Sequence, residues 1–399
     1  MQSLELLRAP ATHNHYSREG KDGRVMEKSY GETSNWTTMI VISVLLTAVA
    51  VYAEQPQSAG KSGTVSTISS TVPSNGDINP YGIFRISRTV GRLQRGNILV
   101  SNFNNSANLQ GTGTTLVQIS PDGAFSLFAQ IDPNHLPGPC PGGVGLTTAL
   151  VVLRSGWVIV GSLPTTDGMA DTAQAGCLLV LDSNGHVAET ITDAQINGPW
   201  DMTVFDGSGE EGKHASEAEL FVTNVLNGTV AGNGNIVNDG TVIRVDLSIG
   251  SKSAPRVKSI TVIGSGFPER TDPAALVIGP TGVALSKNNK TLYVADSLNN
   301  RIAAISDPIT RQTSAKTGTT LSSGGSLNDP LGMALATNGD ILTANGNDGN
   351  MVVTTPKGVQ TATILLDPAG AGVLFGLVDV AGQGVYFVDD GTNTLDLFH

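Results

Sequence analysis

Short apolar runs that end in a polar pair recur along the chain, and they predict β-strands rather than helices. Six such runs share one form, at residues 96–105, 156–165, 218–227, 290–300, 339–348 and 383–392. The same position at the end of each run is taken by Asn102, Ser162, Asn224, Asp296, Asn345 and Asp389. Self-similarity with this period is typical of a propeller built from four-stranded blades.

A second apolar run precedes each of these six, and it usually contains a glycine. These runs lie at residues 79–86, 142–150, 198–205, 279–286, 329–336 and 374–380. Glycine lets backbones crowd around a central axis, so we expect these runs to form the innermost strand of each blade. The sequence therefore predicts an all-β, six-bladed propeller of four-stranded antiparallel blades.

The last blade supplies only three strands before the chain ends at His399. A run at residues 63–72, "GTVSTISSTV", resembles the run "GVQTATILLD" that precedes the last blade. Closing the ring with a strand from the opposite terminus removes exposed sheet edges. We expect residues 63–72 to complete the last blade, which gives a propeller over residues 63–399.

The stretch "GPTGVALSKNNKTLYVADSLNNRI", from Gly279 to Ile302, resembles the NHL repeat and the repeats of the gluconolactonase and senescence-marker superfamily. Degenerate copies cover residues 63–399. The resemblance implies a six-bladed propeller, and it leaves the activity open because such propellers include binding scaffolds, lactonases and lyases.

The composition suits many short strands joined by turns, since 48 of 399 residues are glycine and only 5% are aromatic. The formal net charge is −11, and it belongs to the part after residue 53, because the first 53 residues carry five cationic and five acidic side chains. An acidic surface repels phosphate backbones and anionic lipid heads. We therefore expect no nucleic-acid partner and no binding to the membrane surface.

An apolar segment at residues 39–53 follows a polar N-terminal stretch. It is shorter than the roughly 20 residues that a spanning helix needs. Val51 and Ala53 are suitable small residues before a signal-peptidase cut after Ala53, so residues 1–53 are interpreted as a leader and 54–62 as a linker. The alternative is an uncleaved anchor over residues 36–53, which would be the protein's membrane contact. Both interpretations place the propeller outside the cytoplasm, in the periplasm or the extracellular space.

Cys140 and Cys177 are the two cysteines of the chain, and an exported protein with an even pair is expected to form one disulfide. Both fall on the face that carries three long loops, at residues 102–113, 162–176 and 224–240. We call this side the canopy face. Long loops on a rigid scaffold are where binding tends to occur, although plain surface decoration is an equal alternative.

Relatives that hydrolyse lactones are expected to hold a divalent metal at the channel mouth through the middle residue of a Pro-X-Gly pattern. That position is taken here by Tyr81, Val144, Trp200, Thr281, Leu331 and Phe375, with Asp201 beside Trp200, and the segment of blade two can be aligned in more than one way. A hard cation needs several oxygen ligands, which this ring does not supply. We therefore predict no metal, no cofactor and no catalytic residue carried over from those enzymes.

An apolar and aromatic mouth suits a ligand with a hydrophobic or planar face, so Tyr81, Trp200, Asp201, Thr281, Leu331 and Phe375 are the ligand-binding candidates. The alternative is that these side chains plug the channel. The leading hypothesis is a monomeric binding or scaffolding module that contacts a protein or small ligand on the canopy face of blades one to three. The rival is a hydrolase for an ester or lactone with a rearranged site, using Asp201 with Asp296 or Asp389.

Overall fold

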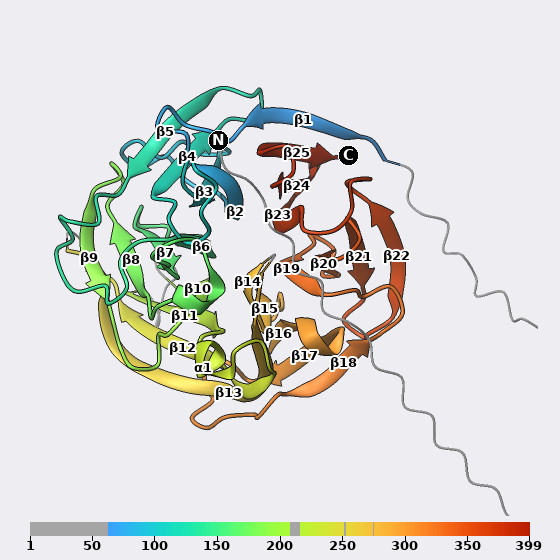
Figure 1. The fold of residues 1–399 in the computed structure, drawn as a ribbon. Coiled ribbons are helices and arrows are strands. Elements are labelled where there is room, and N and C mark those ends of the chain that lie inside the picture. The colour runs from blue at the N-terminus through green and yellow to red at the C-terminus, as the bar shows by residue number, and fades with distance from the viewer. Residues whose placement is uncertain (1–62, 208–215, 251–252, 274) are drawn as a thin grey trace, which may run out of the picture. The chain divides into compact units, whose positions relative to one another are not determined.

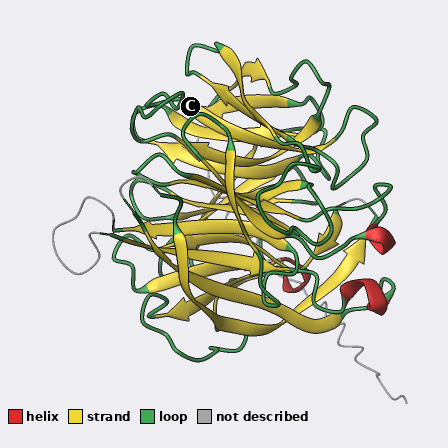
Figure 2. Ribbon diagram, turned by 90° about the vertical axis from the view of Figure 1, so that its left-hand side faces the viewer, coloured by secondary structure: helices red, strands yellow, loops and turns green. Residues whose placement is uncertain are grey.

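The computed structural model describes residues 63–399 except 208–215, 251–252 and 274, and these residues form a six-bladed β-propeller (Figure 1). The apolar segment 39–53, the cut after Ala53 and the linker lie outside the described residues. Seen from the side, the strands run across the ring and the few helical turns lie among its loops (Figure 2). In the described part of the chain, no helix is long and apolar enough to cross a membrane.

The first three blades begin with the strands β2, β6 and β10, which line the axis. Blade one contains β2 (Ile78–Arg85), β3 (Ile98–Asn104), β4 (Thr115–Ile119) and β5 (Phe125–Gln130). Blade two contains β6 (Leu146–Val152), β7 (Val158–Ser162), the 3₁₀ turn η1 (Ala170–Thr172), β8 (Cys177–Leu181) and β9 (Val187–Ile191). Blade three contains β10 (Pro199–Asp206), β11 (Glu217–Asn224), the helical turn α1 (Thr229–Gly232), β12 (Val237–Ser248), β13 (Arg256–Asp272) and β14 (Leu276–Ile278).

The other three blades have shorter loops on the canopy face. Blade four contains β15 (Pro280–Leu285), β16 (Thr291–Asp296), the 3₁₀ turn η2 (Ser297–Asn299), β17 (Arg301–Ser306) and β18 (Thr319–Ser323). Blade five contains β19 (Pro330–Leu335), β20 (Ile341–Asn345), β21 (Asn350–Thr354) and β22 (Gln360–Leu365). Blade six contains β23 (Leu374–Val380), β24 (Gly384–Asp389), β25 (Thr394–Phe398) and β1 (Val65–Ser70).

The strand from residues 63–72 closes the ring, as the sequence predicted. β1 pairs antiparallel with β25 from Val65↔Phe398 to Ser70↔Thr394, so the two ends of the propeller share one sheet (Figure 1). The polar residues at the ends of the second strands are all buried, and five of these six strands end there. The six-bladed architecture is therefore confirmed.

Blade three departs from the four-stranded prediction because it has a fifth strand. β13 is 17 residues long, and β14 folds back along its end with the register Arg270↔Ile278 to Asp272↔Leu276. The sequence did not reveal β14 because this strand has only three residues, too few for a recognisable strand pattern. Its three side chains are buried among those at the axis. In Figure 1, β14 accordingly lies beside the centre of the ring.

Glycines on the inner strands let neighbouring blades touch through their backbones. A Cβ added at Gly282 would lie 2.3 Å from the carbonyl oxygen of Leu331, and one at Gly332 would lie 1.7 Å from that of Phe375. The same contact closes the ring, where a Cβ at Gly376 would lie 2.4 Å from the oxygen of Tyr81. These distances exclude any side chain at the three positions.

Buried hydroxyl groups add hydrogen bonds between neighbouring blades. Ser101 on β3 accepts from the amide of Gly82 and donates to the carbonyl of Thr147 in blade two. Thr223 on β11 repeats the arrangement, because it accepts from the amide of Asp201 and donates to the carbonyl of Thr281 in blade four. Each hydroxyl satisfies buried backbone groups that would otherwise lack a partner.

We predict that Gly332→Ala destabilises the propeller by about 3 kcal/mol, because the new methyl group forces blades five and six apart. Chemical denaturation monitored by circular dichroism would measure this change. Gly370→Ala is the matched control: Gly370 has φ +90° and no heavy atom within 4 Å of the added Cβ. It should cost only the roughly 1–2 kcal/mol of backbone strain. Equal losses for the two variants would contradict the contact.

Candidate functional site at the channel mouth

The predicted mouth residues form a packed aromatic cluster at the axis. Tyr81 stacks on Phe375 with ring centroids 3.9 Å apart and on Phe103 at 4.5 Å, and Trp200 lies 6.4 Å from both Tyr81 and Phe375. Leu331 joins the same cluster. All of these side chains are at most 4% exposed. Their role in ligand binding stays a prediction, and their burial matches the alternative of a plugged channel.

The strand β14 packs against this cluster. Leu276 and Val277 line a small space together with Tyr81 and Trp200, and all four belong to one buried cluster. Leu276 has φ 61°, and the amide of Val277 donates to the carbonyl of Ala275 across it at 2.7 Å. This is the rare γ-turn with positive φ, which is a strained conformation for leucine.

Thr281 is fully buried, and its hydroxyl is committed to protein contacts. It donates to the carbonyl of Pro330 at 2.9 Å and lies 2.7 Å from the hydroxyl of Ser297, which also donates to Pro330. These bonds join blades four and five. Thr281 therefore fastens the ring at the position where lactone hydrolases are expected to have a metal ligand.

The sequence assigned Val144 to the ring position of blade two, and this was wrong. The register places Leu146 opposite Ser162, as Pro80 lies opposite Asn102, so the residue equivalent to Tyr81 is Thr147. The interval to the next pair, Leu150↔Val160, holds one residue more than in blade one. The extra residue is a β-bulge that the glycine-rich segment did not reveal. Val144 precedes β6 and packs between blades one and two.

Asp201 takes the place that glycine holds in blades one, four, five and six. Its carboxylate accepts from the amide of Met202 at 2.8 Å and from that of Val283 in blade four at 2.9 Å. Burial raises the pKa of Asp201 to about 7, and the two amides lower it. The side chain borders a cavity of about 170 Å³ between the inner strands.

Asp296 and Asp389, the other acids of the hydrolase hypothesis, are also held by the protein. Asp296 accepts from Arg301 Nε at 2.6 Å and from Asn299 Nδ2 at 3.0 Å. Asp389 accepts from the amide of Thr392, and burial raises its pKa to about 6. The two residues lie at the ends of β16 and β24, in blades four and six, whereas Asp201 lies in blade three.

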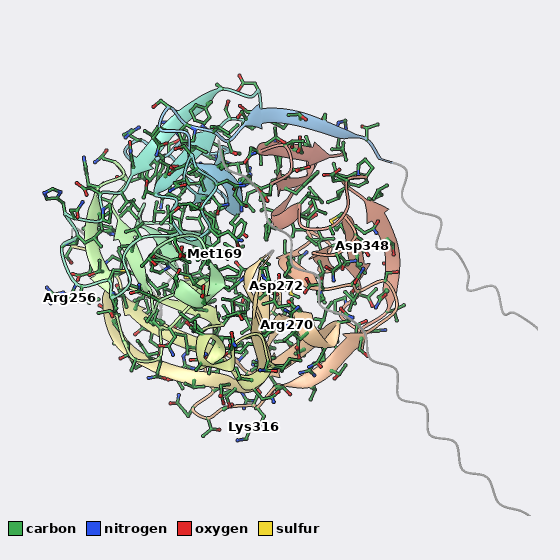
Figure 3. All side chains as sticks on the ribbon, in the orientation of Figure 1. Met169, Arg256, Arg270, Asp272, Lys316 and Asp348 are labelled. Carbon is green, nitrogen blue, oxygen red and sulfur yellow. A yellow bond between two sulfur atoms is a disulfide. The ribbon has the colours of Figure 1, made fainter. Side chains whose placement is uncertain are left out.

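A polar cleft of about 290 Å³ opens beside the aromatic cluster on the canopy face. It lies between the β13–β14 hairpin and the short loops of blades four to six. Leu331 and Phe375 form its floor, while Arg270, Asp272 and Asp329 supply its charged groups. Figure 3 shows Arg270 and Asp272 next to the centre of the ring. We call this space the mouth cleft.

The mouth cleft is lined by one cationic side chain, Arg270, and by two carboxylates, Asp272 and Asp329. Arg270 Nη2 lies 2.8 Å from Asp272 Oδ2, so these two groups form an ion pair. The pKa of Asp329 is raised to about 6, chiefly by burial and also by the charge of Asp272, while Arg270 acts in the opposite direction. None of these three residues was predicted from the sequence. Asp329, for example, has only the pattern of a turn residue before a proline.

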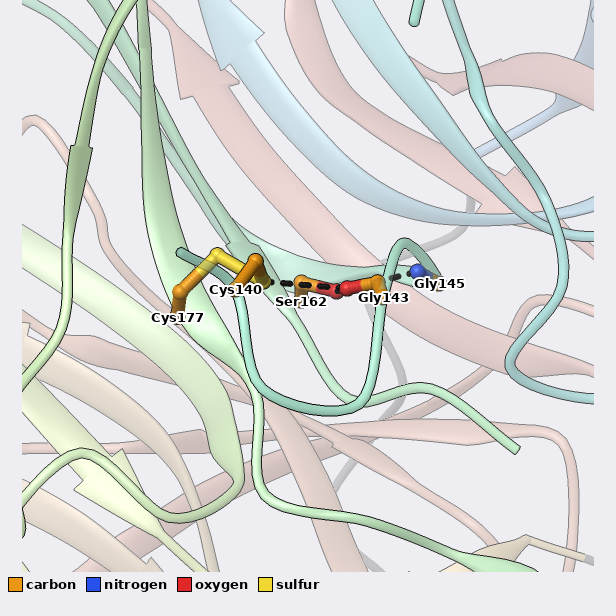
Figure 4. Close-up of a disulfide and its surroundings, with 5 residues drawn as sticks. All are labelled: Cys140, Gly143, Gly145, Ser162 and Cys177. Atoms are coloured by element: carbon orange, nitrogen blue, oxygen red, sulfur yellow. Dashed lines mark hydrogen bonds between the residues drawn. A yellow bond between two sulfur atoms is a disulfide. The ribbon is translucent and has the colours of Figure 1, made fainter. Parts of the chain in front are cut away.

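Within the described residues, no group of three or more His, Cys, Asp or Glu side chains is arranged to hold a metal ion. The predicted disulfide is present: Cys140 and Cys177 are bonded, with their Cα atoms 5.2 Å apart (Figure 4). Next to it, Ser162 Oγ donates to the carbonyl of Gly143 and accepts from the amide of Gly145. These contacts fasten the segment that enters blade two to the long loop of that blade.

Residues 211–380 match the family model described as the SMP-30/gluconolactonase/LRE-like region. The propeller resembles this superfamily, as its repeats predicted. A gluconolactonase from Xanthomonas campestris is similar in structure, with a TM-score of 0.51 and 13% identity, over 86% of this chain and 90% of that one. The calcium-binding protein regucalcin from Agrobacterium tumefaciens has a TM-score of 0.50 and 12% identity, over 81% and 90%. No curated protein sequence matches the chain significantly.

We predict that the propeller becomes less stable as the pH rises from about 5 to 8. Burial raises the pKa values of Asp201 and Asp390 to about 7 and that of Glu269 to about 8, so the folded state binds protons that the unfolded state has released. That stabilisation is lost as the pH passes through the folded pKa values. Scanning calorimetry should show a Tm that falls over this range, and that falls less in Asp201→Asn. A Tm that rises with pH would contradict the prediction.

Proposed function

We propose that this propeller is a ligand-binding module whose site is the mouth cleft on the canopy face. The observation that supports it is the contrast between two places at the mouth. The ring positions at the axis are packed and hydrogen-bonded, whereas the cleft beside them offers about 290 Å³ with both apolar and charged walls. Concave sites with an apolar floor and a few polar groups are typical of small-molecule binding.

The long loops of blades one to three form the opposite side of the same face. They run from β3 to β4, from β7 to β8 and from β11 to β12, and the disulfide fastens one of them. Met169, at the tip of the second loop, is 58% exposed. We propose that this side of the face contacts a protein partner.

A hydrolase function for an ester or lactone has less support. Asp201 already accepts two backbone amides, and Asp296 is bound by Arg301. A general base must reach the substrate proton, and these carboxylates are turned toward the protein.

Blocking the cleft should abolish binding without unfolding the protein. Asn347 is exposed on the rim of the mouth cleft, so Asn347→Trp places an indole over the opening. Asn338→Trp is the matched control, because Asn338 is exposed in the turn at the far end of β20. Saturation-transfer NMR with a library of small organic fragments should detect binders to the wild type and the control that Asn347→Trp does not bind. Fragments that bind all three proteins equally, or a library without binders, would refute the site.

We further propose that the chain is exported and cut after Ala53. The disulfide supports export, because such bonds persist in oxidising compartments. N-terminal sequencing of protein recovered outside the cytoplasm should begin at Glu54. A longer mature chain that stays with the membrane fraction would instead support the anchor over residues 36–53.

A further inference from the structure

Asp329 lines the mouth cleft, and Arg270 is close enough to lower the pKa of its carboxylate. The Oδ1 atom of Asp329 is buried without a hydrogen bond from any described residue. An ionised carboxylate buried in this way is costly unless a donor or a cation approaches it. The backbone around it is well fixed, since its amide donates to Asn300 Oδ1 at 2.6 Å and its carbonyl accepts from the amide of Gly346 at 2.7 Å.

The local fold does not explain why this residue is charged. Asp329 precedes Pro330 at the start of an inner strand and has φ 55°, a conformation that Asp and Asn tolerate. Asn79 precedes Pro80 at the equivalent position of blade one and has φ 60°. An uncharged amide would therefore satisfy the backbone, so the negative charge requires another explanation.

The surroundings of Asp329 favour a positive ligand. The cation of the mouth cleft, Arg270, is already paired with Asp272 at 2.8 Å and donates to the carbonyl of Thr271. Asp329 therefore adds one net negative charge to the cleft, and the whole chain has a formal charge of −11. An anionic ligand would meet repulsion from both sources.

The floor of the cleft is apolar and rests on the aromatic cluster. The ring of Tyr81 stacks on Phe375, which together with Leu331 forms an apolar floor. A ligand in this place meets carboxylates at the walls and hydrocarbon below.

We propose that the mouth cleft binds a small primary ammonium ion that carries an apolar group. The ammonium supplies the donors that Asp329 lacks, and the apolar group rests on Phe375 and Leu331. This inference rests on the proposed function, because it names the ligand class of the same cleft.

Benzylammonium is a suitable probe, with benzyl alcohol as its neutral isostere and benzoate as the anion. In calorimetric titration of residues 54–399 at pH 7.5 and low salt, we expect benzylammonium to bind at least tenfold more tightly than benzyl alcohol, and benzoate not to bind. Lowering the pH to 5 should weaken the binding of benzylammonium, because Asp329 becomes protonated. Equal affinities for the cation and the alcohol would overturn the proposal.

The matched variants are Asp329→Asn and Asp340→Asn. Asn79 shows that asparagine suits this backbone conformation, so Asp329→Asn removes only the charge, and it should weaken benzylammonium at least tenfold while leaving benzyl alcohol unchanged. Asp340 lies at the far end of β20 and accepts from Asn338 Nδ2, so its variant should bind like the wild type. Benzylammonium binding that survives in Asp329→Asn, or that calcium chloride competes away, would refute the ammonium ligand. If benzyl alcohol still binds and Asn347→Trp blocks it, the mouth cleft stands and only the ligand class is wrong.

Discussion

Backbone contact between neighbouring inner strands is the constraint on which the rest of this propeller depends. At Gly282, Gly332 and Gly376 the next blade presents a carbonyl oxygen at 1.7–2.4 Å from where a Cβ would lie. Blades this close leave little room on the axis, and the large side chains of Tyr81 and Phe375 fill it by stacking. The aromatic rings at the axis are therefore packed by the same geometry that closes the ring.

Blades two and three lack the inner-strand glycine, and blade three replaces it with a charged residue. Asp201 replaces the glycine, and its carboxylate reaches across to the amide of Val283, so a side chain performs the contact that backbones make elsewhere. The same blade supplies Trp200, the largest side chain at the mouth, and the β13–β14 hairpin that packs against it. The features in which blade three differs from the repeat therefore occur together. They place the ionisable Asp201 and the β13–β14 hairpin near the axis.

The fold could be predicted because its signals are local and repeated. Alternating strands, turn residues and inner-strand glycines each depend on a few neighbouring residues, so six copies reinforced one another, and closure by residues 63–72 followed from the missing strand. The site could not be predicted in the same way. Thr147 was missed because a bulge shifts β6 by one residue, and β14 is recognisable only from its pairing with β13. Asp329 stands out because its Oδ1 is buried without a hydrogen bond from the described residues, which is a property of the folded chain.

A ring of six similar blades offers six equivalent positions, so a single ligand site requires an element that breaks the symmetry. The similar solved propellers share the fold at 12–13% identity, and that likeness does not transfer their sites. Here the symmetry is broken by loop length: the loops of blades four to six are short, and the hairpin between blades three and four stands beside them. The mouth cleft lies between the β13–β14 hairpin and these short loops. Asp329 lines that cleft at a position where the repeat does not dictate the residue. Its charge is therefore more informative about function than the ring positions inherited from the fold.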